Sequence, residues 1–264
     1  MGHVDSFVFD VFENCVNAIN SNILIQRPSE TDKEFHFQNW FKDRVEALGI
    51  EYDSPGRNTY PDFALVKKPE GFEIKGLASP GREADYDCNS QVPSGLHNGR
   101  TIFYVFGRYP KETKGLKEYE VLDLVICHGD LLNCDHEYTH KNKSIKCFGS
   151  YGDIMIRDRK MYVAKTPFSL ADGLASEKTL ILPNFYDVDE KKYRKVGEII
   201  RREASQLVIG YSFDLQENTI KPEFVENPKA GTEHKFIAYR LINESVKMVV
   251  QKDKPVEDYI EDEE

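Results

Sequence analysis

The chain has 264 residues, 30% charged and 40% hydrophobic, a composition that supports a sizeable folded core and excludes wholesale disorder. Its net charge is −10, yet six acids and no base lie between Glu257 and Glu264, so the rest of the chain is near −4. Residues 139–165 carry seven Lys or Arg against two Asp, and residues 191–202 carry six against one Glu. Because basic surfaces can coexist with an acidic whole, net charge does not exclude a nucleic-acid partner.

Cysteine usage and hydropathy bear on the compartment. There are five cysteines, an odd number, and we find neither a secretory signal at the N-terminus nor an apolar run near the roughly 18 residues of a membrane helix. The simplest interpretation is a cytoplasmic protein with reduced thiols and no membrane partner.

Two amphipathic helices are predicted first. Residues 5–20 place five apolar side chains at helical spacing: Val8, Val11, Phe12, Cys15 and Ile19. A capping box over residues 31–34 opens the second helix, and Gly49 ends it. The apolar stripe of this helix comprises Phe37, Trp40, Phe41, Val45 and Leu48.

The rest of the chain reads as strands with one more helix. Strands are predicted over 101–107, 119–127, 235–241 and 245–250, with a mixed region to about residue 163. A helix is predicted over 191–207 from the spacing of Tyr193, Val196, Ile200 and Leu207. No repeat or linker divides the chain. We expect a single α/β (α+β) domain over 1–255, a mixed central sheet flanked by helices, and an acidic tail over 256–264.

A charged hairpin carries the strongest chemical signal. Asp62 ends one short apolar run, and Glu73 and Lys75 lie two apart in the next, on one face of a strand. Residues 67–71 have the Pro and Gly of a reversing turn, which would bring Asp62 beside Glu73. Two carboxylates, with the Ile74 carbonyl, would suit Mg²⁺, while Lys75 would position the attacking water and stabilise phosphate charge. The alternative is an exposed hairpin with ordinary surface charges.

Pro61-Asp62, ten residues, then Glu73-Ile74-Lys75 resembles the PD-(D/E)XK nuclease signature. The resemblance implies a restriction-endonuclease-like core, with insertions. It also implies that an acid on the preceding helix, here Glu34, can join the metal site. Glu34 has a competing role, because an acid at the third helical position closes a capping box and complements the helix dipole.

The resemblance implies a prokaryotic type II restriction enzyme: a Mg²⁺-dependent endonuclease that cuts double-stranded DNA at a specific sequence. It also implies a homodimer, since two active sites are needed to cut both strands of a symmetric site. Two alternatives stay open. One is a repair or recombination nuclease for mismatched or branched DNA, and the other is a non-catalytic DNA-binding module on the same fold.

Two polar segments are candidates for contacting DNA. The stretch 76–99 follows the hairpin and offers Arg82, Asn89 and Gln91, side chains that can hydrogen-bond base edges. The segment 155–162 holds three cations between apolar residues: Arg157, Arg159 and Lys160. A solvated loop and a salt-bridged hairpin are the respective alternatives.

A second metal site is a weaker hypothesis. Half of the chain's twelve Cys and His residues lie between 127 and 147. Four of them could surround zinc: Cys134, His136, His140 and Cys147. Their spacing lacks the paired C-x₂-C knuckles of strong zinc motifs, so buried thiols and surface histidines are the default.

Overall fold

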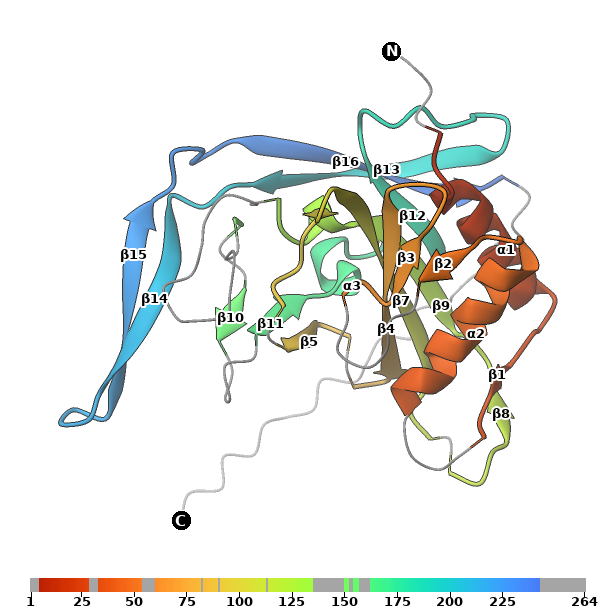
Figure 1. Ribbon diagram of the computed structural model, residues 1–264, viewed down its shortest axis with the longest axis horizontal. Coiled ribbons are helices and arrows are strands. Elements are labelled where there is room, and N and C mark those ends of the chain that lie inside the picture. The colour runs from red at the N-terminus through yellow and green to blue at the C-terminus, as the bar shows by residue number, and fades with distance from the viewer. Residues whose placement is uncertain are drawn as a thin grey trace, which may run out of the picture.

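The computed structural model describes residues 5–28, 33–53, 60–81, 83–89, 91–112, 114–134, 150–151, 154–156 and 162–242. A nine-stranded mixed sheet dominates this part of the chain (Figure 1). In spatial order its strands are β13 (Tyr193–Arg202), β16 (Glu233–Leu241), β12 (Lys178–Pro183), β9 (Asp123–His128), β7 (Arg100–Pro110), β4 (Glu70–Ser79), β3 (Phe63–Leu65) and β2 (Tyr52–Asp53), with β6 (Leu96–His97) on β7. Two neighbouring pairs, β4–β7 and β9–β12, are parallel. The α+β class and the mixed sheet agree with the expectation.

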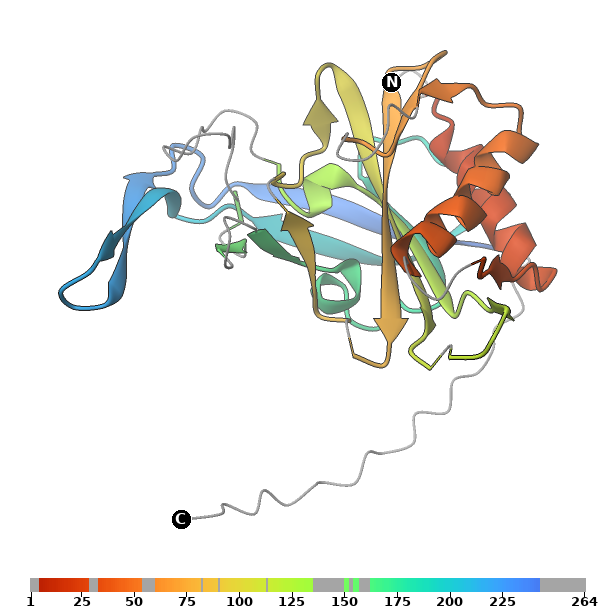
Figure 2. The same cartoon turned by 60° about the horizontal axis from the view of Figure 1, so that its bottom comes forward.

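The helix predicted over 191–207 is wrong, because this segment forms β13 and enters the next strand, β14 (Gln206–Asp214). Gly197 lies within it, and Val196, Ile199 and Ile200 are β-branched, all poor choices for a helix interior. Pairing with β16 over the full length of β13, with a bulge near Gly197, decides the outcome. β14 pairs with β15 (Thr219–Glu226) in a hairpin that projects from the main body (Figure 2).

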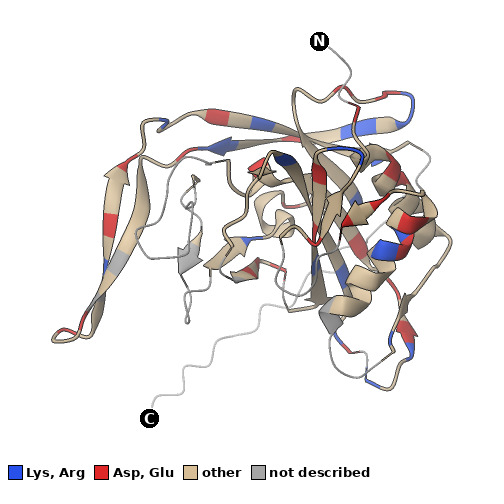
Figure 3. Ribbon diagram, in the orientation of Figure 1, with Lys and Arg blue, Asp and Glu red and all other residues tan. Residues whose placement is uncertain are grey.

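The basic residues of β13 are interspersed with acids, as Figure 3 shows for β13 and β16. Glu198 accepts hydrogen bonds from Lys195 and from Lys235 on the neighbouring strand, and Arg202 pairs with Glu233. Part of the basic run counted over 191–202 therefore forms ion pairs with acids on β13 and β16.

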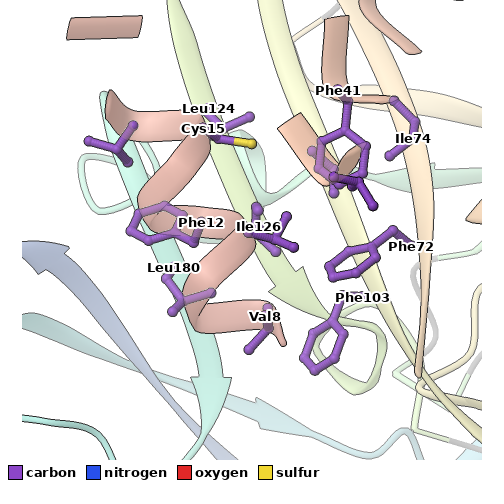
Figure 4. Close-up of a cluster of buried hydrophobic side chains, with 14 of the residues drawn as sticks. Val8, Phe12, Cys15, Phe41, Phe72, Ile74, Phe103, Leu124, Ile126 and Leu180 are labelled. Carbon is purple, nitrogen blue, oxygen red and sulfur yellow. The ribbon is translucent and has the colours of Figure 1, made fainter. Parts of the chain in front are cut away.

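Helices α1 (Val8–Asn20) and α2 (Lys33–Ala47), both predicted from the sequence, cover one face of the sheet. Their apolar side chains pack on alternate residues of the central strands (Figure 4). This cluster includes Val8, Phe12, Cys15, Phe41, Phe72, Ile74, Phe103, Leu124, Ile126 and Leu180. Leu48 lies just beyond α2 and is 37% exposed, so it is not part of the buried stripe. Nearby, β1 (Ile25–Gln26) pairs with β8 (Glu118–Tyr119).

The other face carries a second apolar cluster beneath a small three-stranded sheet. Its strands, in spatial order, are β10 (Met155–Ile156), β11 (Tyr162–Lys165) and β5 (Asp85–Asn89). Two short helical turns, η1 (Gly129–Leu131) and α3 (Pro167–Leu170), contribute side chains to the same cluster. The buried side chains of this cluster include Tyr86, Tyr104, Phe106 and Tyr162.

Close helix packing over β7 depends on glycine. The Phe37 ring of α2 lies directly over Gly107, where a Cβ atom would overlap it. At Gly76 on β4, a Cβ would lie 3.2 Å from the Cβ of Phe37. The two glycines thus let α2 approach the two parallel strands that carry the candidate site on their opposite face.

Strands β7 and β16 confirm the predictions over 101–107 and 235–241. The single strand predicted over 119–127 is wrong in extent, because its first residue ends β8, which pairs with β1, and β9 of the main sheet begins at Asp123. The strand predicted over 245–250 and the tail over 256–264 lie outside the described residues.

Candidate active site

The predicted hairpin is present and brings Asp62 opposite Glu73. β3 and β4 are antiparallel, with Phe63 facing Phe72 and Ala64 facing Gly71. Gly71 permits the close approach, because a Cβ there would lie 2.5 Å from Cγ of Pro61. Phe72 and Ile74 face the helices, so Glu73 and Lys75 project from the other face of β4, as the period of two requires.

Four groups of this hairpin are joined by hydrogen bonds. Oδ2 of Asp62 accepts the backbone N–H of Ile74 at 2.8 Å, and Oε2 of Glu73 accepts that of Asp62 at 3.2 Å. Nζ of Lys75 donates to Oε1 of Glu73 at 2.7 Å. The side chains of Glu73 and Lys75 are 11% and 13% exposed, so the pair is largely shielded from solvent. The structure therefore brings together the three residues that the sequence singled out.

The arrangement fits a hard divalent cation. Carboxylate and carbonyl oxygens are the ligands such ions prefer, and Asp62 and Glu73 supply the carboxylates. In a strand, the N–H and C=O of one residue point toward the same neighbour. Because the N–H of Ile74 points to Asp62, its carbonyl faces the same side, where it can serve as a third oxygen ligand.

A narrow pocket opens at Glu73 and Lys75, with a free volume of about 10 Å³. Aromatic, thiol and amide groups complete its wall: Tyr60, Tyr86, Cys88, Gln91 and Tyr104. Burial raises the pKa of the Cys88 thiol to about 12 and holds the pKa values of Tyr86 and Tyr104 well above their usual range. These walls are therefore uncharged at neutral pH, and Cys88 does not offer a thiolate nucleophile.

The tyrosines of this wall are the residues that the sequence did not single out. The Tyr60 and Tyr104 hydroxyls lie 2.9 Å apart, and that of Tyr60 also donates to the Ser94 carbonyl. Tyr104 faces Glu73 across the parallel β4–β7 pair. Two features of the sequence could have pointed to these tyrosines. Tyr60 directly precedes Pro61 of the motif, and Tyr104 lies within the predicted strand 101–107.

The structure places one of the predicted base-reading residues at the pocket. Gln91 lines it, and the amide of Gln91 donates to the Val92 carbonyl at 3.1 Å. Asn89 ends β5, opposite Tyr162, and its side chain is outside the described part. Four further predicted contacts fall outside the described residues: Arg82, Arg157, Arg159 and Lys160. The strands that flank residues 157–161 in sequence, β10 and β11, belong to the sheet that includes β5.

Glu34 lies in the first turn of α2, and its side chain is not described. α2 packs on the face of the sheet opposite Glu73 and Lys75, with Phe37 over Gly76 and Gly107. A metal-binding role for Glu34 stays a prediction.

The predicted zinc ligands are only partly within the described residues. His136, His140 and Cys147 lie outside them, whereas Cys134 is described and contacts Ser150, Glu203 and His234. This contact set was not anticipated from the sequence, because Glu203 and His234 are 69 and 100 residues from Cys134.

The chain matches no protein-family model and no curated protein sequence. Among its described helices, none is both long enough and apolar enough to span a membrane.

Proposed function

We propose that this protein is a Mg²⁺-dependent endonuclease that hydrolyses phosphodiester bonds in double-stranded DNA at a specific sequence, as a type II restriction enzyme does. The observation that carries the proposal is the joined set of Asp62, Glu73, Ile74 and Lys75, in which each carboxylate accepts a backbone N–H from the segment bearing the other. The PD-(D/E)XK spacing of these residues supports the same function.

Each residue has a separate role in this proposal. Asp62 and Glu73 hold the cation together with the Ile74 carbonyl, and Mg²⁺ there would supply Lewis-acid activation of the attacking water and of the scissile phosphate. Lys75 lies beside Glu73 on the same face of β4 and would orient the water and stabilise charge that develops on the phosphate. The hydrogen bonds that already fix these side chains reduce the reorganisation needed when substrate binds.

The narrow pocket has a consequence for substrate entry. A free volume of about 10 Å³ holds about one water molecule and is too small for a phosphodiester group. A phosphate would therefore approach the proposed metal site from the half-exposed Asp62 and not through this pocket. β11, which pairs with β5, follows residues 157–161 in the sequence, and we propose that Arg157, Arg159 and Lys160 contact DNA.

We further propose that the active species is a homodimer. Cutting both strands of a symmetric DNA site calls for two equivalent active centres related by a two-fold axis. The alternatives, a nuclease for mismatched or branched DNA and a non-catalytic DNA-binding module, share the fold and differ in their products.

Digestion of a plasmid with the purified protein in Mg²⁺ or in EDTA tests the proposal. Discrete linear fragments in Mg²⁺ alone are expected for a sequence-specific enzyme. Nicking that depends on a mismatch or a branch would indicate the repair nuclease, and tight DNA binding without cleavage by any divalent ion would indicate the binding module. Asp62→Asn is expected to abolish cleavage while Lys67→Ala, at the exposed turn of the same hairpin, leaves it intact; cleavage by Asp62→Asn at the wild-type rate would refute the site.

A further inference from the structure

A second cluster of ligand-type side chains lies away from the Asp62–Glu73 hairpin. It consists of the thiol of Cys134, which follows η1, the carboxylate of Glu203, directly after β13, and the imidazole of His234 on β16. Sγ of Cys134 lies 3.3 Å from Nε2 of His234 and 3.6 Å from Oε1 of Glu203, and these last two atoms are 2.8 Å apart. We infer that these three residues form a Zn²⁺ site.

The distances among Sγ, Nε2 and Oε1 suit a single cation bound by all three atoms. With Zn–S near 2.3 Å and Zn–N or Zn–O near 2.0–2.1 Å, ligand atoms of a tetrahedral site lie roughly 3.3–3.6 Å apart. The two distances from Cys134 Sγ are in this range, and the His234–Glu203 distance has to open by about half an ångström. A set of thiolate, imidazole and carboxylate selects zinc over Mg²⁺, which prefers oxygen ligands alone.

Sγ of Cys134 also lies 3.3 Å from Oγ of Ser150, and hydrogen bonds among the thiol, this hydroxyl and Nε2 of His234 depend on which atom carries the proton. Without a metal, these groups and Glu203 can form a hydrogen-bonded network. A central cation would instead contact Sγ, Nε2 and Oε1 at once, and the metal content of the protein distinguishes the two arrangements.

The geometry does not fit a cysteine nucleophile with a histidine base. In such a relay the thiol and the carboxylate contact opposite nitrogens of the ring, so that the histidine passes a proton between them. Here both Cys134 and Glu203 contact the same atom, Nε2 of His234. Convergence on one point is the arrangement of metal ligands.

Outer contacts hold the ligands in place. Glu203 has a side chain only 4% exposed, and its second oxygen accepts a hydrogen bond from the amide of buried Asn227 at 3.0 Å. The backbone N–H of Cys134 donates to Oγ of Ser150 at 3.0 Å, and the N–H of Ala204 donates to the Ser150 carbonyl. Partners of this kind orient metal ligands and tune their affinity. Zinc here would tie the chain after η1 to the outer strand pair β13–β16.

Zinc measured by elemental analysis, in protein expressed with added zinc and dialysed without chelator, tests the site. Close to one equivalent per chain is expected, falling at least about tenfold in Cys134→Ser, Glu203→Gln and His234→Ala. Cys15→Ser, which alters a buried core thiol, is the matched control and keeps its zinc. A His234→Ala protein that retains a full equivalent overturns the inference, and so does wild-type protein that stays zinc-free after reconstitution.

A second measurement avoids dependence on how the variants fold. Wild-type protein stripped with a chelator and titrated with Co²⁺ should give thiolate-to-metal charge-transfer absorption with tetrahedral d–d bands, and its Tm should rise with Zn²⁺ but not with equal Mg²⁺. Absence of both signals refutes the site. Neither measurement uses DNA cleavage, so failure here leaves the proposed nuclease function untouched, and a chain without nuclease activity can still bind zinc.

His136→Ala and His140→Ala separate this site from the one suggested by sequence spacing. If the ligands are Cys134, Glu203 and His234, zinc content depends on His234. Loss of zinc in both His136→Ala and His140→Ala together with full retention in His234→Ala would assign the metal to the other set and overturn the inference.

Discussion

The backbone N–H of Asp62 donates a hydrogen bond to Oε2 of Glu73 at 3.2 Å, so the carboxylate of one proposed metal ligand orients the backbone of the other. The same carboxylate accepts the ammonium of Lys75 through its second oxygen. Glu73 therefore links the backbone of Asp62 to the side chain of Lys75. Replacing Glu73 with Gln removes the negative charge and keeps the shape of the side chain.

Glu73→Gln is expected to lower cleavage by at least about a hundredfold while the protein stays folded. The amide keeps an oxygen to accept the Asp62 N–H but loses the charge that holds the cation. Glu70→Gln is the matched control, because Glu70 lies on the same strand and faces α1 instead, where Oε2 accepts the N–H of Phe7. Plasmid cleavage rates at neutral pH measure both variants; equal rates for the two would contradict the assignment of Glu73.

Lys75→Ala is expected to remove cleavage and leave DNA binding without metal within a few fold of wild type. The ammonium is one cation in a pocket where both its side chain and that of Glu73 are largely buried, so it acts on the reacting phosphate more than on overall attraction. Cleavage and a mobility-shift titration in EDTA are measured together, with Lys67→Ala as the surface control. A parallel loss of binding and cleavage would instead make Lys75 a general phosphate contact.

Local pattern predicted the hairpin because its determinants are adjacent in sequence. The turn over 67–71, the period of two on β4 and the residues Asp62, Glu73 and Lys75 lie within 14 positions, and strand register then fixes their meeting. The two helices were predictable for the same reason, since their apolar stripes repeat locally.

Long-range pairing decided what local pattern missed. The segment 191–207 has apolar residues at helical spacing, yet pairing with β16, some 40 residues later, makes its first part a strand. The contacts of Cys134 with Glu203 and His234 likewise join three distant parts of the chain. Spacing rules for zinc motifs search nearby positions only, so they pointed to His136, His140 and Cys147 instead.

Gly107→Ala is expected to destabilise the protein by about 1–3 kcal/mol, because the new Cβ overlaps the Phe37 ring and forces α2 away from β7. Urea unfolding measures the loss. Adding Phe37→Leu removes the planar ring from this position, so the double variant should be less destabilised than the sum of the two single variants. If the losses in free energy of unfolding of the two single variants simply add in the double variant, the contact between residues 37 and 107 does not limit how closely α2 packs on β7.

Glu70 should make stability depend on pH. Burial raises the pKa of this carboxyl above its ordinary value of 4.5, so the folded state retains the proton over a pH range in which the unfolded chain has released it. The contribution of Glu70 to stability is therefore fully present below about pH 4.5 and is lost as pH rises through the higher pKa of the folded state.

Glu70→Gln keeps an acceptor for the N–H of Phe7 but cannot ionise. Relative to wild type, this variant should gain stability as pH rises above about 4.5, as measured by urea unfolding at several pH values. Glu217→Gln, at an exposed turn, provides the control. If the free energy of unfolding of Glu70→Gln changes with pH from 4 to 8 in the same way as that of the wild type, this carboxyl has the same pKa in the folded and unfolded chain and the prediction is wrong.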